Sequence, residues 1–355
     1  MKAGIFDPYL DTVGGGERYA LTMAEALLEK GWQVDIFWKD WSIKDKLIKK
    51  FSLNIERVNF LPYSPRVNNL FNRWRFEKNY DLLFYFSDGS IPLMFSKKNI
   101  LHFQVPFKNV LKKSTINLLK LKKIDIIVCN SYFTKSIIDS CLGVNSVVVY
   151  PPIDIDSFQP LKKENIILSV GRFSQLLQSK RQDVLIEAFK ILVDQTGLKN
   201  WKLILAGGTE IGAGDFLEAL KKRCLGYPVE IVENPDFKNL VELYGKAKIF
   251  WTASGYGIDE EKDPEKVEHF GMTTVEAMAA GCVPVVIAKG GQKEIVDKLK
   301  NGFLWEKKED LINITLRIIR EEKLMKQLSK NAMLKSRCFS KDKFKENVTS
   351  LIKRK

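Results

Sequence analysis

The chain has 355 residues, of which 45% are hydrophobic and 28% are charged. These values are ordinary for soluble globular proteins, so they exclude a mainly disordered or low-complexity chain, and the length favours two hydrophobic cores over one. The formal net charge of +14 favours an anionic partner, which could be a nucleic acid, an anionic lipid or a phosphorylated substrate.

The first half of the chain alternates short apolar runs with amphipathic stretches. A strand is predicted at 2–6, three glycines follow at 14–16, and a helix at 17–30 leads to a strand at 32–38. This order begins a βαβ unit. Further strands are predicted at 81–86, 99–103, 124–129 and 146–150.

Pro151 and Pro152 interrupt this pattern and predict a linker. Strands are predicted after it at 165–170, 201–206, 229–232, 248–252, 283–288 and 302–305. Helices are predicted at 180–195, 240–247 and 273–280, and the last fifty residues read as almost entirely helical. We therefore expect an α/β protein with two Rossmann-like, doubly wound domains that face a central cleft, where ligands bind at the carboxyl ends of strands.

We expect the domains to span 1–160 and 161–335, with a C-terminal helix at 336–355 that returns to the first domain. The five cysteines are scattered and form no CxxC pair, which predicts buried free thiols in a reducing compartment. No apolar stretch approaches the ~20 residues that span a bilayer, and acidic residues follow the first strand too closely for a signal peptide. We expect a cytoplasmic protein, or one bound peripherally at the cytoplasmic membrane face.

Two glutamates eight positions apart, Glu268 and Glu276, flank a glycine turn at Gly271. The second glutamate falls inside the helix that follows the turn. Amides expected to be free at the start of this helix are those of Met272, Thr273 and Thr274. Free amides and the helix dipole favour an anion such as a diphosphate, and the carboxylates can accept hydrogen bonds from hydroxyls. The alternative is a surface loop with two unrelated glutamates.

This segment resembles the E-x7-E signature of the family 4 retaining glycosyltransferases, and the resemblance continues over 277–285. It implies a GT-B fold, with an acceptor-side domain at 1–160 and a nucleotide-sugar-binding domain at 161–335. It also implies that Glu268 contacts the donor sugar and that Glu276 contacts the ribose. The match is good over most of the second domain and limited to short motifs in the first.

Arg172 and Lys180 follow a predicted strand, where two cations can neutralise a diphosphate leaving group. The alternative is that both are solvated surface residues. They are similar to the diphosphate-binding arginine and lysine of the family, and Arg181 is a possible stand-in. The resemblance therefore makes Arg172 and Lys180 both catalytic and donor-binding.

In the first domain, Gly15 and Gly16 belong to a loop that resembles the glycine-rich, donor-facing loop of the family. Backbone without side chains can approach a ligand closely there. His102 ends a predicted strand, at a place where family members carry a histidine near the donor sugar, which makes it a catalytic candidate. A satisfied structural histidine is the alternative, and His269 is expected to support Glu268 indirectly.

Asp154-Ile155-Asp156 matches a metal-binding D-x-D pattern, but it lies in the predicted linker. The resemblance implies transfer without a metal or another cofactor, and the nucleotide sugar is a substrate. Between residues 97 and 123 there are eight lysines, including Lys112 and Lys113, and no acidic residue. This basic segment can lie on an anionic membrane, pack on its own sheet, or do both.

The motifs look most like the branch of lipid-linked mannosyltransferases. We expect retaining transfer of a hexose, with mannose from GDP-mannose favoured, to a lipid-linked or glycan acceptor. The alternatives are an inactive partner subunit that binds lipid or protein, and another GT-B reaction such as sugar-nucleotide epimerisation. Nucleic-acid binding is not expected, because no recognised motif accompanies the charge.

Overall fold

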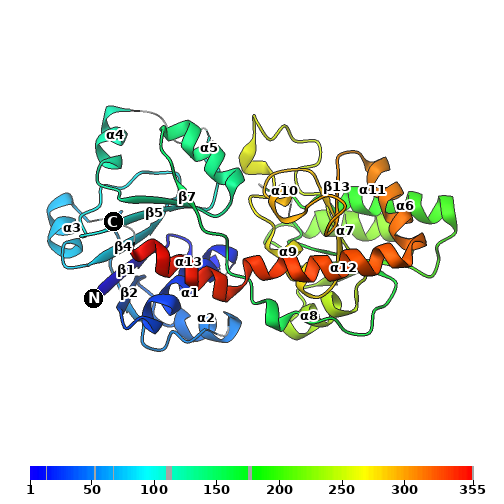
Figure 1. The fold of residues 1–355 in the computed structure, drawn as a ribbon, viewed down its shortest axis with the longest axis horizontal. Coiled ribbons are helices and arrows are strands. Elements are labelled where there is room, and N and C mark those ends of the chain that lie inside the picture. Colours follow the sequence, from blue (N-terminus) through cyan, green and yellow to red (C-terminus); the bar gives the residue numbers. More distant parts are fainter. Residues whose placement is uncertain (13, 52, 67, 109–113, 175–177, 354–355) are drawn as a thin grey trace. The chain divides into compact units, whose positions relative to one another are not determined.

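The computed structural model describes residues 1–12, 14–51, 53–66, 68–108, 114–174 and 178–353. The chain forms two compact units, Met1–Pro152 with Lys341–Lys355, and Ile153–Ser340 (Figure 1). The first unit therefore ends at the second proline of the predicted linker, and not at residue 160. The chain comes back to this unit at Lys341.

Unit 1 contains a parallel sheet of seven strands in the order β3-β2-β1-β4-β5-β6-β7. The strands are β1 (Lys2–Phe6), β2 (Gln33–Phe37), β3 (Asn59–Leu61), β4 (Leu82–Phe86), β5 (Asn99–Phe103), β6 (Ile126–Cys129) and β7 (Val147–Val148). Side chains alternate between two cores, since Leu82 and Phe84 enter one and Leu83 and Tyr85 enter the other. This two-sided burial explains why the strands appear as nearly continuous apolar runs.

The helices of unit 1 cover both faces of the sheet. They are α1 (Gly15–Glu29), α2 (Ile43–Phe51), α3 (Leu70–Glu77), α4 (Thr115–Leu121), α5 (Tyr132–Leu142) and α13 (Lys341–Lys353). Helices α1, α2 and α13 pack into the core that holds Leu82, whereas α3, α4 and α5 pack into the core that holds Leu83. The C-terminal helix thus completes the core of the N-terminal unit.

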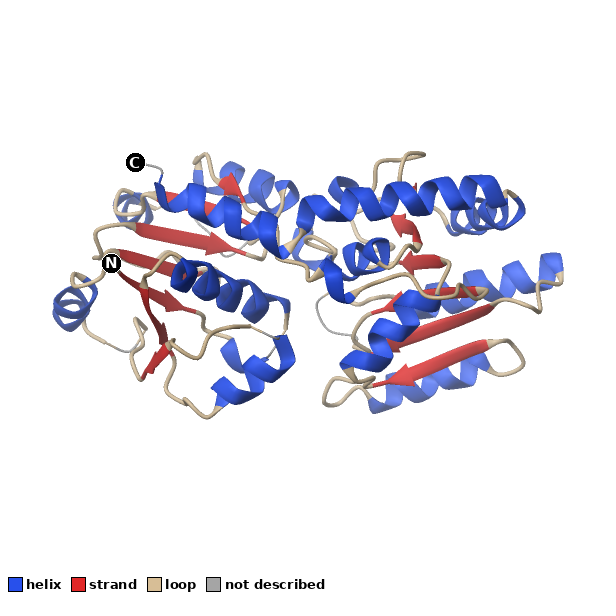
Figure 2. Ribbon diagram, turned by 60° about the horizontal axis from the view of Figure 1, so that its bottom comes forward, coloured by secondary structure: helices blue, strands red, loops and turns tan. Residues whose placement is uncertain are grey.

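Unit 2 contains a parallel sheet of six strands in the order β10-β9-β8-β11-β12-β13. The strands are β8 (Ile166–Val170), β9 (Lys202–Gly207), β10 (Val229–Glu233), β11 (Ile249–Thr252), β12 (Val283–Ile287) and β13 (Phe303–Trp305). The helices are α6 (Gln182–Thr196), α7 (Gly214–Cys224), α8 (Phe237–Lys246), α9 (Met272–Ala279), α10 (Gln292–Ile295), α11 (Lys308–Arg320) and α12 (Glu322–Ser336). Figure 2 shows each sheet as a layer between helices.

The strand order of unit 2 reverses between the neighbours β8 and β11. In doubly wound sheets, ligands bind beyond the carboxyl ends of the strands at such a reversal. The loops after β8 and β11 carry Arg172, Lys180 and Glu268, so the fold places these sequence-distant candidates at one sheet edge.

All the predicted strands are present with small shifts at their ends, and β3 is an additional short strand. None of the five cysteines, all of which the structure describes, forms a disulfide, but only Cys129 and Cys282 are buried, and Cys338 is exposed. The prediction of buried thiols is therefore wrong for Cys338, which lies in a short 3₁₀ turn between α12 and α13. Within the described residues, no helix combines the length and the apolar character needed to cross a bilayer.

Candidate active site

An ion pair between Lys180 and Glu268 joins the loops that follow β8 and β11. Lys180 Nζ lies 2.7 Å from Glu268 Oε2, and the two side chains are 22% and 18% exposed. Because β8 and β11 are neighbours, residues 88 positions apart meet at the sheet edge. The structure thus brings together two catalytic candidates that the sequence analysis identified in separate motifs.

Glu268 is ionised at neutral pH. Burial raises the pKa of its carboxyl, but the nearby Lys180, with smaller effects from His269 and Arg172, outweighs burial and holds the pKa below its ordinary value. Burial lowers the pKa of His269 to about 4, so this imidazole is neutral. A carboxylate in this state can accept hydrogen bonds from sugar hydroxyls, but it has no proton to donate.

Glycines allow the loops around Glu268 and Lys180 to pack closely. A Cβ on Gly207, at the end of β9, would lie 2.0 Å from the carbonyl oxygen of Gly171, and a Cβ on Gly290 would lie 2.0 Å from that of Glu268. The amide of Gly291 donates a 2.9 Å hydrogen bond to the same Glu268 carbonyl. The sequence analysis missed this packing role, although the glycine pairs at 207–208 and 290–291, close to the ends of β9 and β12, were the available signal.

Helix α9 begins after Gly271, which adopts φ 115° and ψ 53°. A Cβ there would lie 2.8 Å from Nε2 of Gln292. The prediction of a free amide is wrong for Thr274, because this amide donates a 3.0 Å hydrogen bond to the Gly271 carbonyl. Its hydroxyl also donates to Oε1 of Gln292 at 2.9 Å, and the residue is fully buried. The turn therefore leaves Met272 and Thr273 as the amides that can serve an anion.

Glu276 lies on α9 and is 6% exposed. The Tyr244 hydroxyl, from α8, donates a 3.0 Å hydrogen bond to Glu276 Oε2. This contact holds one oxygen of the Glu276 carboxylate against α8. Sequence reasoning missed Tyr244, because nothing in its local pattern pointed to α9.

Arg172 and Arg181 differ in how well their side chains could bind a phosphate. Arg172 is exposed, and its charge contributes to the lowered pKa of Glu268. Arg181 adopts φ 50°, and its guanidinium donates to both carboxylate oxygens of Asp183 at 3.0 Å and to the Tyr256 carbonyl at 2.8 Å. Arg181 is thus committed to internal contacts, which favours Arg172 over Arg181 as the phosphate-binding group.

In unit 1, the glycine-rich loop opens α1 as expected. Gly15 is the first helical residue, and a Cβ on Gly16 would lie 2.7 Å from Oε1 of Gln104. The Glu17 carboxylate accepts a hydrogen bond from the Gly14 amide, so the chain supplies its own anion at this helix start.

The surroundings of this loop are acidic. Burial, followed by the charges of Glu17 and Asp11, raises the pKa of Asp7 to about 7. Asp7 is 3% exposed, and it accepts a 3.0 Å hydrogen bond from the Tyr9 amide. Negative groups here suit sugar hydroxyls better than a phosphate.

His102 lies at the end of β5 but points into the core. Its ring is fully buried, 4.2 Å from the Tyr19 ring and 4.8 Å from the Phe86 ring by their centroids. Burial lowers the pKa of His102 to about 3, and the nearby Val128 backbone only partly opposes this shift. A contact with substrate would require the ring to become exposed, so its geometry gives the predicted catalytic role no support.

Comparisons with known proteins show the family to which the chain belongs. The model of the family described as "Glycosyl transferases group 1" matches residues 152–335, and that described as "Glycosyltransferase Family 4" matches residues 13–157. The chain therefore belongs to the glycosyltransferases that these two models describe.

The sequence of this glycosyltransferase is also similar to those of individual curated proteins. It is 30% identical over 239 residues to the mouse GDP-Man:Man(3)GlcNAc(2)-PP-Dol alpha-1,2-mannosyltransferase. The matched segment covers 62% of this chain and 46% of the mouse protein. The chain thus matches about half the length of these curated relatives. An uncharacterized glycosyltransferase from Haemophilus influenzae is 26% identical and covers 99% of both chains.

Solved structures support a GT-B fold for the glycosyltransferase. HepE from Anabaena, in complex with UDP, has a TM-score of 0.76 at 18% identity and covers 99% of both chains. Sucrose-phosphate synthase from Thermosynechococcus elongatus has a TM-score of 0.73 at 18% identity, with 99% of this chain and 98% of that chain covered.

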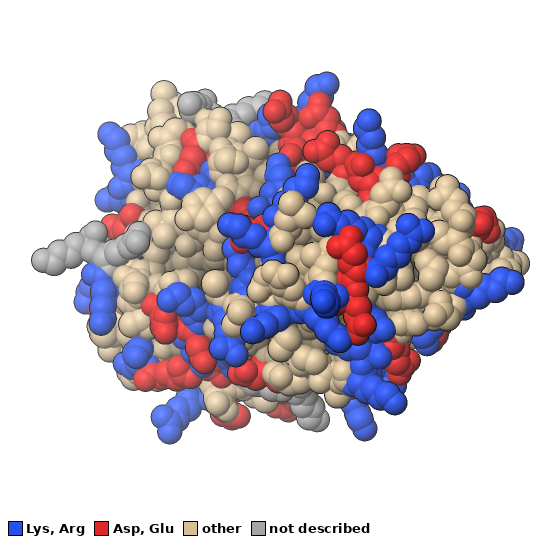
Figure 3. Space-filling view, turned by 45° about the vertical axis from the view of Figure 1, so that its right-hand side comes forward, with Lys and Arg blue, Asp and Glu red and all other residues tan. Residues whose placement is uncertain are grey.

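The basic segment at 97–123 is only partly described, and Lys112 and Lys113 lie outside the described residues. Lys97 pairs with Asp81 at 2.7 Å. Lys98 donates to the carbonyls of Leu351 and Ile352 at 3.1 Å and 2.8 Å, so part of the segment serves the packing of α13. On the face drawn in Figure 3, Lys and Arg side chains are interspersed with Asp and Glu.

The D-x-D pattern lies in a linker turn, where Asp154 accepts a 2.7 Å hydrogen bond from Ser157. Among the residues that the structure describes, no three His, Cys, Asp or Glu side chains gather into a metal-binding group. The independence of the glycosyltransferase from metals therefore remains a prediction.

Proposed function

We propose that the protein transfers a hexose from a nucleotide-diphosphate sugar to a glycan or lipid-linked acceptor with retention of configuration and without a metal ion. The observation that carries this proposal is the Lys180–Glu268 ion pair, 2.7 Å long, at the carboxyl edge of the sheet where strand order reverses. At this edge the cation can bind the diphosphate of a nucleotide sugar, and the carboxylate can bind the hydroxyls of its sugar.

The diphosphate binds Arg172, Lys180 and the amides at the start of α9. Arg172 is already exposed, and Lys180 exchanges its contact with Glu268 for a phosphate oxygen. Cations fixed in this way stabilise the negative charge that develops on the leaving group. The protein's own cations therefore do the work that a metal does in other transferases.

The two glutamates bind hydroxyls. Glu268, ionised because of Lys180, orients the donor sugar, and Glu276, held by Tyr244, binds the ribose. The acceptor hydroxyl attacks the anomeric carbon on the face from which the diphosphate departs. Its proton passes to a diphosphate oxygen, so no protein nucleophile is needed.

We favour mannose from GDP-mannose as the donor. The support is the similarity to mannosyltransferases whose names include GDP-Man, at 28–32% identity over the matched segments. The same names contain Man(3)GlcNAc(2)-PP-Dol, which supports a lipid-linked acceptor, and with such an acceptor we infer a peripheral position of this chain at an anionic membrane. HepE, with a similar fold, was solved with UDP and glucose, so the fold is compatible with other donors.

The proposal is tested by thermal unfolding with UDP, GDP, ADP and their sugars, without added metal. A ligand that binds only the native state raises the midpoint. We expect GDP and GDP-mannose to raise it in the wild type and in Arg320→Ala, which removes an exposed arginine on α11. We expect no shift in Arg172→Ala. An unchanged wild-type midpoint with every nucleotide would refute a donor site in the free protein.

A further inference from the structure

Helix α3 in unit 1 has its apolar side outward. Leu70, Phe71 and Trp74 are 60%, 66% and 45% exposed, whereas Arg73 and Glu77 are 8% and 0% exposed. A surface helix of a soluble protein normally buries its apolar stripe and exposes its charges. In α3 this pattern is reversed. Two points therefore need an explanation: which contacts hold the charged side of α3 inside the protein, and which partner covers its apolar side.

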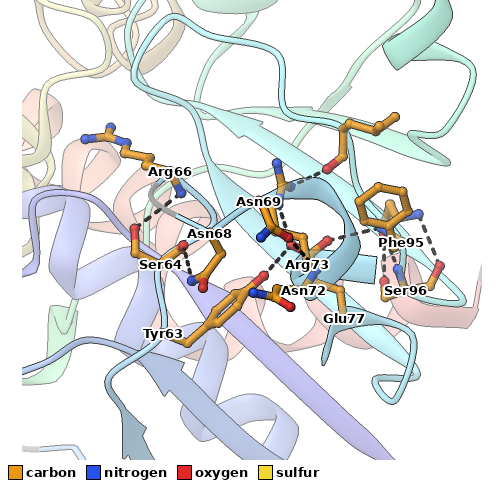
Figure 4. A network of polar contacts seen from close by, with 12 residues as sticks. Tyr63, Ser64, Arg66, Asn68, Asn69, Asn72, Arg73, Glu77, Phe95 and Ser96 are labelled. Carbon is orange, nitrogen blue, oxygen red and sulfur yellow. Dashed lines mark hydrogen bonds and ion pairs between the residues drawn. The ribbon is translucent and has the colours of Figure 1, made fainter. Parts of the chain in front are cut away.

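A polar network holds the charged side (Figure 4). Arg73 Nε donates to Glu77 Oε1 at 3.0 Å, and its guanidinium also donates to the Leu93 carbonyl. Glu77 further accepts from the Tyr63 hydroxyl at 2.8 Å and from the Phe95 amide at 3.2 Å. A buried ion pair with these additional hydrogen-bond partners fixes the rotation of α3 about its axis. The exposure of its apolar side is therefore determined by the fold.

The helix is also anchored and capped. The Phe76 ring stacks on Tyr63 with centroids 4.0 Å apart. At the start of the helix, the side chain of Asn69 accepts a 2.9 Å hydrogen bond from the Asn72 amide. On the outer side, the rings of Phe71 and Trp74 are 6.1 Å apart, and Lys78 Nζ lies 3.9 Å from the centroid of the Trp74 ring.

Helix α4 shows a second exposed apolar group on the same side of the sheet. Ile116, Leu118 and Leu119 are 64%, 49% and 63% exposed. Both α4 and α3 pack one partly buried side chain, Leu121 and Phe76, into the core opposite to that of α1 and α13. The two apolar groups therefore belong to helices that cover one face of the seven-stranded sheet (Figure 1).

Basic side chains predominate beside both helices. The acidic residues that follow them, Asp81 and the exposed Asp125, pair with Lys97 at 2.7 Å and accept a 2.7 Å hydrogen bond from the Asn99 amide, respectively. Between residues 62 and 80 the only acidic residue is Glu77, which is buried and paired. Arg75 and Lys78 are exposed beside Trp74, and Lys122 and Lys123 are exposed at the end of α4. A second copy of this chain would bring like charges together, whereas an anionic bilayer offers both opposite charge and an apolar layer.

We propose that α3 and α4 form a docking surface for an anionic lipid bilayer, in which Phe71 and Trp74 enter the headgroup layer and the flanking cations contact lipid phosphates. Tryptophan is well suited to this position, because its ring is apolar and its N–H remains hydrated. This inference rests on the peripheral membrane position in the proposed function and assigns it to named side chains.

The full-length protein is sedimented with phosphatidylcholine vesicles that contain or lack phosphatidylglycerol. We expect binding only with phosphatidylglycerol, and binding weakened about tenfold or more by the double variant Phe71→Ser, Trp74→Ser. The matched control is Trp41→Ser, which removes a 74% exposed tryptophan outside α3 and α4 and should bind like the wild type. All variants should keep the wild-type unfolding midpoint and its nucleotide-dependent shift.

Absence of vesicle binding by the wild type would overturn the inference, and so would equal binding by the wild type and the double variant. A wild-type dimer that the double variant converts to a monomer would show that a second copy covers the surface instead. Loss of the nucleotide-dependent shift in the wild type would count against the proposed donor site, and it leaves the vesicle result unaffected. The two failures can therefore be told apart.

Discussion

Glu268 contacts two other loops of the candidate site, one through its carboxylate and one through its backbone carbonyl. Its carboxylate pairs with Lys180, and its backbone carbonyl accepts a hydrogen bond from Gly291. In the proposed reaction the Glu268 carboxylate binds the donor sugar, and Lys180 binds the diphosphate. Removing the charge of Glu268 should therefore have opposite effects on catalysis and on nucleotide binding.

Glu268→Gln should lower the rate of transfer by about 10²–10³-fold, as loss of an oriented charge in an active site does. The same change frees Lys180, so GDP should bind at least as tightly as it does to the wild type. Turnover and the GDP-dependent midpoint are measured in parallel, with Glu309→Gln, an exposed position on α11, as the control. Normal turnover in Glu268→Gln would remove this residue from the mechanism.

Asp7 makes the stability of unit 1 depend on pH. Burial and two acidic neighbours raise the pKa of Asp7 from 3.8 to about 7, so the native state holds a proton that the unfolded chain releases. The contribution of Asp7 to stability is thus highest below pH 3.8, falls as the pH rises to about 7, and then stays low. The total loss is at most about 4 kcal/mol, since one pKa unit corresponds to ~1.4 kcal/mol.

Asp7→Asn should abolish this component. The variant should gain stability relative to the wild type as the pH rises from 3.8 to about 7, which denaturant unfolding across this range can measure. Asp40→Asn is the control, because Asp40 is exposed and its pKa is lowered by Ser42. A constant difference in stability between Asp7→Asn and the wild type over the whole range would contradict the prediction.

At the scale of elements, the site depends on how closely the loops after β8 and β9 pack. Gly207→Ala would place a methyl group 2.0 Å from the Gly171 carbonyl, and backbone must move to relieve this overlap. We expect a loss of ~1–3 kcal/mol in stability together with weaker nucleotide binding, because Arg172 follows Gly171 directly. Gly214→Ala is the matched control, since a Cβ there meets no atom within 4 Å.

Strong local signals made most elements predictable. Buried parallel strands such as β1 and β4 have apolar side chains toward both cores, so their sequences stand out from those of the helices. The strand β3 was missed because it has only three residues and its first residue, Asn59, is exposed. Helix α3 was missed because its order of apolar and charged residues is governed by tertiary contacts of Arg73 and Glu77.

The candidate site was predictable where residues act through charge and lie in a motif. Arg172, Lys180 and Glu268 were identified on this basis, and the order of the strands explains why they share an edge. The buried orientation of His102 was not predictable, since strand position alone does not tell which core its ring enters. Likewise, the Thr274 amide was expected to be free because the local turn at Gly271 was not visible in the sequence.

At the scale of the whole molecule, the chain completes its first unit with its last helix. Glu25 of α1 is 1% exposed and pairs with Lys341 at 2.8 Å and with Lys345 at 2.9 Å. The Phe344 ring lies 4.7 Å from the Tyr19 ring in an edge-to-face arrangement and is 2% exposed. The stability of unit 1 thus depends on residues that are synthesised after the whole of unit 2.

This arrangement predicts that the two units can be destabilised separately. Phe344→Ala should cost unit 1 about 3–5 kcal/mol, as loss of a buried phenylalanine does elsewhere, while the donor-binding residues Arg172, Lys180 and Glu268 lie in unit 2. Hydrogen exchange should therefore show faster exchange in β1, β4 and α1 of the variant, and GDP should still protect the loops around Lys180 and Glu268. Lys343→Ala, a half-exposed position on the same helix, should leave both readouts unchanged. Loss of GDP protection in Phe344→Ala would show that the nucleotide site needs an intact unit 1, and the prediction that the two units can be destabilised separately would then be wrong.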